Sequence, residues 1–263
     1  MSNKYGWIPD LPDIRDRKFA YAGIAPTIYL PESVDLRVLC PLVYHQLKTG
    51  SCVANALGAA HQIEQMRHRG VEHAFVPSRL FVYYNARALN GTVREDAGTY
   101  IRTGIKTMVA DGVCPETVWP YDESRFDEKP GMECYALAAN HQVLSYHRIN
   151  QTLAEMQICL AEGYPFAFGF TIYTGFESST VTRTGEGQLP RRFERALGGH
   201  AVLAVGYDNR TKRFLIRNSW GDKWGQKGYF TLPYEYLTSG DLSADFWTIR
   251  MIELPLAKRR KTK

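Results

Sequence analysis

The stretch QLKTGSCVANALGAA, residues 46–60, contains a cysteine in a setting that suits covalent chemistry. Cys52 follows Gly50 and Ser51 directly, at the start of a run whose apolar residues recur at helical spacing. A nucleophilic thiol requires a lowered pKa, a nearby base and a group that stabilises an oxyanion. The alternative is a structural cysteine buried in a core, which needs no partners elsewhere in the chain.

Candidate partners for the thiol lie in the second half of the chain. The segment HAVLAVGYDNRTKRFLIRNSW has two apolar runs around a polar turn, Asp208 to Lys212, and this pattern predicts a β-hairpin. A turn centred on Asn209 places His200 directly opposite Asn218, with both side chains on one face. The alternative is a histidine that only ends a strand, because a register slip of one residue would separate the pair.

Charge and composition disfavour several other kinds of site. The 263-residue chain has a net charge of +5, and five basic residues lie within its last six positions. The rest of the chain is neutral, so we expect no nucleic-acid partner. No cysteine–histidine group has zinc spacing, which predicts no metal and no cofactor. No run is long and apolar enough to span a membrane, and we expect none.

The elements that must position these residues change in character along the chain. Residues 51–112 have helical periodicity, with Ser78 as a candidate N-cap and Gly70 as a candidate helix stop. Short β-like runs dominate after about residue 165. This order predicts an α+β protein with a helical lobe, an antiparallel β lobe and a cleft between them. The predicted segments are an N-terminal extension, 1–31, a mainly helical lobe, 32–145, a mainly β lobe, 146–255, and a disordered basic tail, 256–263.

Several motifs resemble the papain-like cysteine peptidases. They are LPESVDLR, the spacing Q-x-x-x-x-S-C, GVCPETVWPYD, GGHAVLAVGY and IRNSWGDKWGQKGYF, in that order. A cysteine with its histidine far downstream is a known pattern of this family. The similarity spans roughly residues 30 to 253 and is greatest to the compact bacterial members of the family. The resemblance implies the two-lobe papain fold, a peptidase activity and peptide or protein substrates.

The resemblance also implies a role for each candidate residue. Cys52, at the positive end of a helix dipole, would be the nucleophile, and His200 would form an imidazolium–thiolate pair with it. Asn218 would orient the histidine ring. The side-chain amide of Gln46 would join the Cys52 backbone N–H as an oxyanion donor. Trp220 would cover the His–Asn bond from water, although an indole in a β core is the alternative.

Some features depart from the family pattern. Thr49 and Val53 replace the cysteine and the aromatic residue that commonly flank the nucleophile, so the usual first disulfide of the family cannot form. Where many members have a Gly-Gly pair lining the substrate cleft, this chain has EDAGTY, and Gly98 is the expected substrate-binding equivalent. Two rival functions remain open: an amide transferase or amidase that uses the same Cys–His–Asn chemistry, and an inactive binding protein on this fold.

Four further cysteines allow three pairings if all are bridged. Cys114 and Cys134 bracket the WPYD loop and are the favoured disulfide, whereas Cys159 is expected as a buried free thiol. The alternative is that all four are free. No signal peptide is recognisable, which predicts a cytoplasmic protein or one exported without such a signal.

The N-terminal extension, 1–31, which we call the strap, is rich in proline and in apolar side chains. These side chains should pack on the body rather than remain in a disordered tail. A proline-stiffened, extended segment also suits a cleft that binds extended peptides, so the strap is a candidate intramolecular inhibitor. The alternative is a brace across the back of the lobes. The side chains expected to pack are Trp7, Ile8, Leu11, Ile14, Phe19 and Tyr21.

Overall fold

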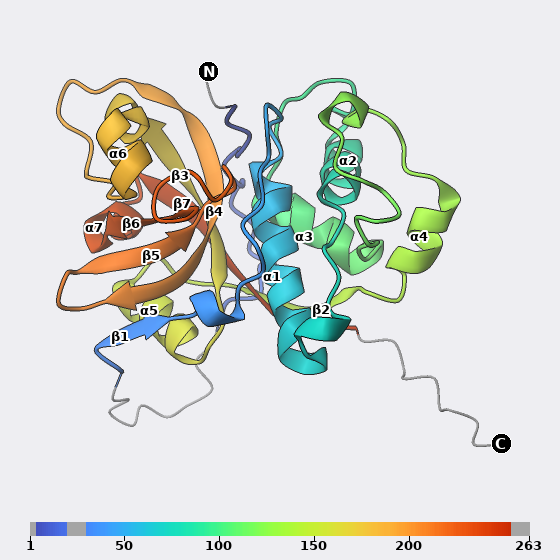
Figure 1. Ribbon diagram of the computed structural model, residues 1–263, viewed down its shortest axis with the longest axis horizontal. Helices are drawn as coiled ribbons and strands as arrows, with labels where there is room; N and C mark the ends of the chain where they lie inside the picture. Colours follow the sequence, from blue (N-terminus) through green and yellow to red (C-terminus); the bar gives the residue numbers. More distant parts are fainter. Residues whose placement is uncertain (1–3, 20–29, 254–263) are drawn as a thin grey trace.

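A computed structural model describes residues 4–19 and 30–253 of the chain. Four of the described α-helices gather on one side of the molecule, and an antiparallel sheet with three further helices lies on the other (Figure 1). This arrangement confirms the predicted α+β class with a helical and a β lobe. The basic tail predicted for 256–263 lies outside the described residues. The helices of the first lobe are α1 (Cys52–Arg69), α2 (Arg79–Asn90), α3 (Ile101–Ala110) and α4 (Met132–Ala138).

The β lobe is built on a seven-stranded sheet in which every described pairing of strands is antiparallel. The strand order is β2-β7-β3-β4-β5-β6, and β1 pairs with β4. Three helices accompany the sheet: α5 (Leu153–Ala161), α6 (Ser179–Thr184) and α7 (Tyr234–Thr238). The strands are β1 (Ser33–Asp35), β2 (Val143–Arg148), β3 (Phe166–Tyr173), β4 (Ala196–Asp208), β5 (Arg213–Arg217), β6 (Tyr229–Pro233) and β7 (Ser243–Ile252).

Helix α1 is the central element between the two lobes. Every residue from Cys52 to Gln65 is buried, because α1 packs on α2 and α3 and also on β4 and β7. Buried polar groups in the helix need hydrogen-bond partners. The Gln65 side chain donates to Phe75 O and accepts from the Phe75 N–H. The helix ends at Gly70, the predicted stop, where φ is +83°. A helix held on both sides fixes its first residue, Cys52, at the junction of the lobes.

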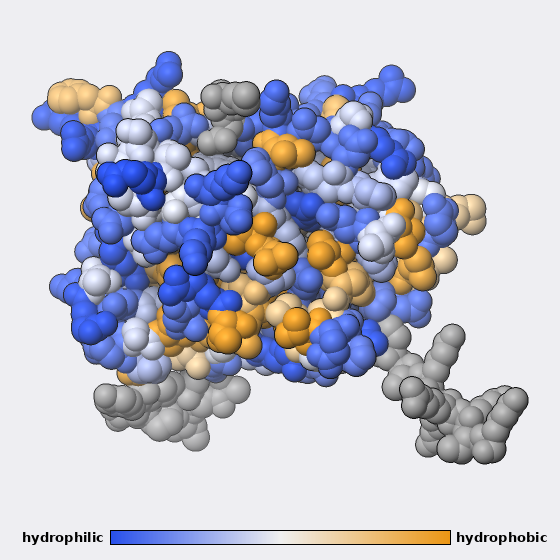
Figure 2. All heavy atoms as spheres, viewed as in Figure 1, coloured by the Kyte–Doolittle hydropathy of each residue, from blue (hydrophilic) through white to orange (hydrophobic). Residues whose placement is uncertain are grey.

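Two apolar clusters hold the lobes together. One lies between the helices and the sheet and includes Leu57, Ile105 and Trp247. The other lies within the β lobe and includes Phe168 and Phe214. The visible face in Figure 2 is mostly polar, with apolar side chains gathered toward its middle. The burial of these clusters provides the rigid frame for the cleft.

The side chain of Ser78 accepts a hydrogen bond from the Phe81 N–H at 3.2 Å, which confirms the predicted N-cap of α2. The cysteine prediction needs a correction. Cys114 and Cys134 are free thiols in contact with one another rather than a disulfide. Both are fully buried in the apolar cluster of the helical lobe, where a reduced cysteine packs as a small hydrophobic side chain. Cys159 is a buried free thiol, as predicted.

No helix in the part of the chain that the structure describes is long and apolar enough to cross a membrane. The same residues contain no group of three or more His, Cys, Asp or Glu side chains placed to hold a metal ion.

Candidate active site

Cys52 is the first residue of α1, and its thiol lies where the helical lobe meets β4. The Ala201 N–H of β4 donates to Cys52 Sγ at 3.4 Å. The side chain is fully buried, and burial raises the pKa of the Cys52 thiol to about 11. The thiol is therefore protonated at neutral pH in this state of the molecule.

His200 and Asn218 are joined by a hydrogen bond between His200 Nε2 and Asn218 Oδ1 at 2.9 Å. Both side chains are buried, and Asn218 Oδ1 also accepts from the Ser219 N–H at 2.8 Å. Because Asn218 uses its oxygen, the histidine donates from Nε2, and Nδ1 has no hydrogen-bond partner among the described residues. Burial lowers the pKa of His200 to about 4, against the opposing effect of Asn218. The ring is neutral here, with one nitrogen free to act as a base.

The hairpin register predicted for this pair is wrong, although the contact exists. The ladder between β4 and β5 ends at Leu203 opposite Arg217, after an irregularity near Gly206. His200 therefore lies beyond the paired residues of β5. Asn218 follows the end of β5, and its side chain reaches His200 from the loop rather than from a directly opposite strand position.

Gln46 lies in the loop before α1 with its side chain buried. Its Nε2 donates to the carbonyl oxygens of Thr49 at 3.0 Å and Lys4 at 3.1 Å. Its Oε1 accepts from Ser219 Oγ at 2.6 Å. Ser219 was not singled out from the sequence, although it lies within the NSW motif. It fixes the orientation of the Gln46 amide, so that the N–H₂ side is the one that faces the cleft.

Trp220 stacks on His200, with ring centroids 4.9 Å apart and 25° between the planes. The indole also packs edge-to-face on Trp224 and Phe176. It thereby covers one face of the imidazole with a large apolar surface. Water is excluded from that side of the His–Asn pair, which strengthens the hydrogen bond between them.

The strap passes through the cleft and binds both of its walls. On the helical side, the Thr99 N–H donates to Gly6 O at 2.8 Å, and the Ile8 N–H donates to Thr99 O at 3.1 Å. On the β side, the Trp7 N–H donates to Gly199 O at 2.9 Å. Figure 1 shows this segment, in dark blue, between α1 and the sheet.

Glycines make this close approach feasible. Gly98 has φ of +78°, and a Cβ there would lie 2.1 Å from Gly6 O. The ring of Trp7 lies against the backbone of β3, where a Cβ on Gly169 would meet it at 1.9 Å. Trp7 Nε1 donates to Asp245 Oδ2 at 3.1 Å. Gly98, the residue expected to bind substrate, is thus in contact with the strap.

The strap continues beyond the cleft as an ion-paired segment. Asp16 forms a bidentate pair with Arg102 of α3, at 2.8 and 2.6 Å, and accepts from Arg148 at 3.0 Å. Asp10 accepts from Trp247 Nε1 at 3.0 Å. Both arginines are largely covered, and bidentate pairs of this kind are the stronger form of ion pair.

The packing predicted for the apolar strap residues is correct in part. Trp7 and Phe19 are buried, and Ile8 is half-buried. Leu11 is 75% exposed and Ile14 fully exposed, so the prediction is wrong for both. Here the carboxylates, rather than the apolar side chains, bind the body. Tyr21 lies outside the described residues.

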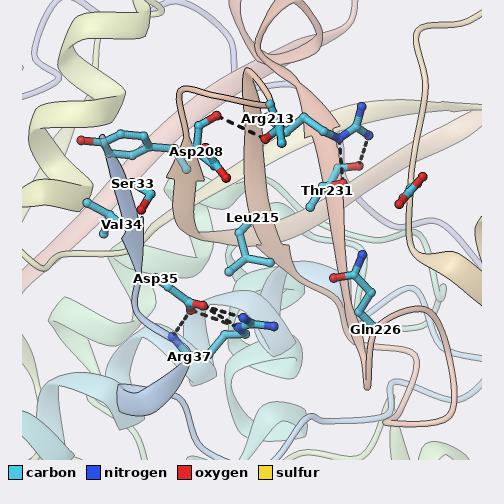
Figure 3. A pocket seen from close by; sticks show the side chains of 12 residues that line it. Ser33, Val34, Asp35, Arg37, Asp208, Arg213, Leu215, Gln226 and Thr231 are labelled. Atoms are coloured by element: carbon cyan, nitrogen blue, oxygen red, sulfur yellow. Dashed lines mark hydrogen bonds and ion pairs between the residues drawn. The ribbon is translucent and has the colours of Figure 1, made fainter. Parts of the chain in front are cut away.

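A pocket of about 440 Å³ lies elsewhere, between β1, β5 and β6. In Figure 3 its polar groups bond one another: Arg37 pairs with Asp35, and Arg213 donates to the Thr231 hydroxyl. None of the predicted catalytic residues lines it. The candidate active site is therefore the strap-filled cleft at Cys52.

A family model for papain family cysteine proteases matches residues 30–240. The chain belongs to this family. An uncharacterized peptidase C1-like protein of Acanthamoeba polyphaga mimivirus is 37% identical over 97% of this chain and 89% of that protein. Cysteine proteinase 3 of Solanum lycopersicum is 31% identical over 78% of this chain and 56% of its own length.

Solved structures of papain-family proteases have the same fold. Xylellain, a cysteine protease from Xylella fastidiosa, is 40% identical, with a TM-score of 0.85 over 95% of this chain and 98% of xylellain. Procathepsin L 3 of Tenebrio molitor superposes with a TM-score of 0.69 at 16% identity, over 90% of this chain and 75% of its own, which shows the fold alone. The similarity to xylellain confirms the compact bacterial type predicted from the motifs.

Proposed function

We propose that this papain-family protease is an endopeptidase that cleaves peptide bonds through an acyl-enzyme on Cys52. One observation carries the proposal. The turn after β5 contains both Asn218, which holds His200, and Ser219, which holds Gln46. A single short segment thus contacts both His200, the proposed base, and Gln46, the proposed oxyanion donor. A base and an oxyanion donor held in fixed orientations support covalent acyl transfer on Cys52.

In the first half of the reaction, His200 takes the Cys52 proton and the resulting thiolate attacks the carbonyl carbon of the substrate. The oxygen becomes an oxyanion, which the Gln46 amide and the Cys52 backbone N–H stabilise. The C–N bond then breaks, and His200 transfers its proton to the leaving amine. In the second half, His200 takes a proton from water, which attacks the thioester and releases the carboxylate product, and Cys52 regains its proton.

The rival functions differ in what they release. An amidase or amide transferase would release ammonia from glutamine without cutting peptides, and an inactive binding protein would do neither. A positional-scanning peptide library, incubated with the purified protein under reducing conditions, separates the three. Peptide cleavage that a thiol-alkylating reagent abolishes supports the endopeptidase, whereas ammonia release alone supports the transferase class.

We further propose that the strap inhibits the full chain. Its backbone bonds both walls of the cleft, and Lys4 O accepts the Gln46 N–H that the oxyanion would need. The Gly6 N–H lies against Cys52 Sγ, so the strap backbone covers the thiol. Burial in this state favours the neutral forms of Cys52 and His200. Release of the strap would hydrate both groups and allow the imidazolium–thiolate pair to form.

Replacing Gln46 with alanine should lower kcat by about 10²–10³-fold with little change in KM, once the strap is displaced. The amide would bind the transition-state oxygen more strongly than the substrate carbonyl, and the loss of an interaction made only in the transition state lowers kcat. Initial rates over a range of peptide concentrations separate the two constants. An equal rise in KM would instead make Gln46 a ground-state contact.

The strap should bind more tightly in acid. Burial, and then the nearby Asp245 carboxylate, raise the pKa of Asp10 to about 6, although Trp247, Arg102 and Arg148 oppose the rise. An exposed aspartate has a pKa of about 4, so the docked state binds the proton more strongly. The resulting stabilisation is fully present below about pH 4 and is lost as pH rises through about 6.

This linkage is measurable as the rate at which iodoacetamide alkylates Cys52. The rate in the full chain, divided by the rate in a form that begins at Leu30, should rise between about pH 4 and about pH 6. Asp10→Asn should flatten that rise. A ratio that falls with pH, or one that keeps its slope in Asp10→Asn, would show that Asp10 does not control docking.

A further inference from the structure

Asp96 is a carboxylate bonded to the loop that precedes the nucleophile, and the proposed mechanism does not use it. It lies in the loop between α2 and α3, and its Oδ1 accepts from the Gly50 N–H at 2.9 Å and from the Tyr83 hydroxyl. Gly50 precedes Cys52 by two residues. The Asp96 side chain is only 13% exposed. The carboxylate is therefore held in one position on the wall of the cleft.

The strap places a basic residue on this carboxylate. Lys4 Nζ lies 2.6 Å from Asp96 Oδ2. The carbonyl oxygen of the same residue accepts from Gln46 Nε2 at 3.1 Å. One residue thus satisfies both the oxyanion donor and the carboxylate, which shows that a carbonyl held by Gln46 and a basic side chain held by Asp96 are compatible.

We propose that Asp96 selects substrates in which the residue that supplies the scissile carbonyl is lysine or arginine. This inference rests on the proposed function, in which Gln46 binds that carbonyl. When the carbonyl of a substrate residue binds Gln46, the side chain of that same residue lies within reach of Asp96, as the side chain of Lys4 does. An arginine could donate two hydrogen bonds to the carboxylate, and a lysine one. A neutral side chain would leave the negative charge without its partner once the strap has left.

Other charges near Asp96 do not replace that partner. Arg87 lies over the ring of Tyr83 and acts on Asp96 through space. Its guanidinium donates to the backbone carbonyls of Val93, Glu95 and Phe126, and no described hydrogen bond joins it to Asp96. Arg87 reduces the negative electrostatic potential around Asp96, but a substrate side chain can still pair with the Asp96 carboxylate directly.

A purely structural role is the alternative for Asp96, because it braces the Gly50 loop. Asparagine separates the two roles. In Asp96→Asn, the amide oxygen still accepts from Gly50 and Tyr83, so the brace remains, whereas the charge is removed. A matched control is Glu123→Gln, which removes a negative charge whose carboxylate accepts from the Lys48 N–H of the same lobe.

The experiment uses the full chain with Trp7→Ala, which weakens the strap without altering the catalytic groups. Cleavage is measured for peptide pairs that differ only in arginine or citrulline before the scissile bond. The kcat/KM for arginine should exceed that for citrulline by about fivefold, the range of a partly exposed ion pair. Trp7→Ala with Asp96→Asn should cleave both peptides about equally, and the Glu123→Gln control should retain the preference.

The outcomes distinguish this inference from the function on which it rests. Cleavage of both peptides at equal rates by Trp7→Ala would overturn the role of Asp96 and leave the peptidase standing. A basic preference that appears only on the leaving-group side of the bond, or that survives in Asp96→Asn, would also overturn it. If Trp7→Ala cleaves no peptide while iodoacetamide reaches Cys52, the endopeptidase proposal fails and this inference fails with it.

Discussion

Replacing Cys52 with alanine should abolish peptide cleavage and leave the fold intact. The thiol is the atom that would bond the acyl group, and removal of a catalytic nucleophile lowers kcat by about 10⁴-fold or more. Of the five described cysteines, Cys52 is the one whose Sγ accepts from the N–H of Ala201, the residue after His200, so the four others are not placed to substitute for it. The measurement is turnover of a fluorogenic peptide after strap release, with thermal unfolding to check the fold.

Cys40→Ala is the matched control, because Cys40 is also a free thiol and is more accessible than Cys52. It should keep full activity and remove a background site of alkylation. Turnover retained by Cys52→Ala would refute the assignment of the nucleophile. A loss of activity in Cys40→Ala alone would point to a thiol that the mechanism does not include.

Loosening the strap should raise the activity of the full chain by at least about tenfold. The Trp7 side chain is 8% exposed, packs on the backbone of β3 and donates to Asp245. Truncation of a buried tryptophan typically costs about 3–5 kcal/mol, which is enough to shift a docked segment toward its released state. Trp7→Ala and a form that begins at Leu30 should therefore both cleave peptides faster than the unaltered chain.

Ile14→Ala provides the control within the strap, because Ile14 is fully exposed and its loss should change nothing. Trp7 also belongs to the apolar cluster of the helical lobe, so the unfolding temperature of each form must be compared. If the form that begins at Leu30 is well folded and no faster, the strap is a brace and the inhibition proposal is wrong.

The proposals for Cys52 as nucleophile and for the strap as inhibitor share one structural basis. If the strap inhibits, it does so because Lys4 O accepts the Gln46 N–H and because burial raises the pKa of the Cys52 thiol. A faster Trp7→Ala protein should therefore also be alkylated faster at Cys52. Activity and alkylation that change separately would mean that the strap blocks access without controlling the thiol.

Local sequence was sufficient for the features that depend on local interactions. The helical run after Cys52, the stop at Gly70 and the N-cap Ser78 follow from side-chain periodicity, glycine conformation and capping within a few residues. The α+β class followed from the change of period along the chain. The contact between His200 and Asn218 was predicted on a hairpin centred on Asn209, but the turn lies further along the chain, with Asp208 opposite Arg213, and an irregularity follows near Gly206. No local pattern marked either feature.

Only the tertiary structure decided what surrounds the thiol. The strap residue Trp7 meets Asp245 across 238 positions of sequence, and Lys4 meets Asp96 and Gln46 across the cleft. The sequence predicted that apolar residues would hold the strap, and Trp7 and Phe19 are buried as predicted. Leu11 and Ile14 remain exposed, and the carboxylates of Asp10 and Asp16 bind the body as well. These contacts arise from packing between segments far apart in the chain. Periodicity and spacing report only the neighbours of a residue along the chain, so they cannot specify such partners.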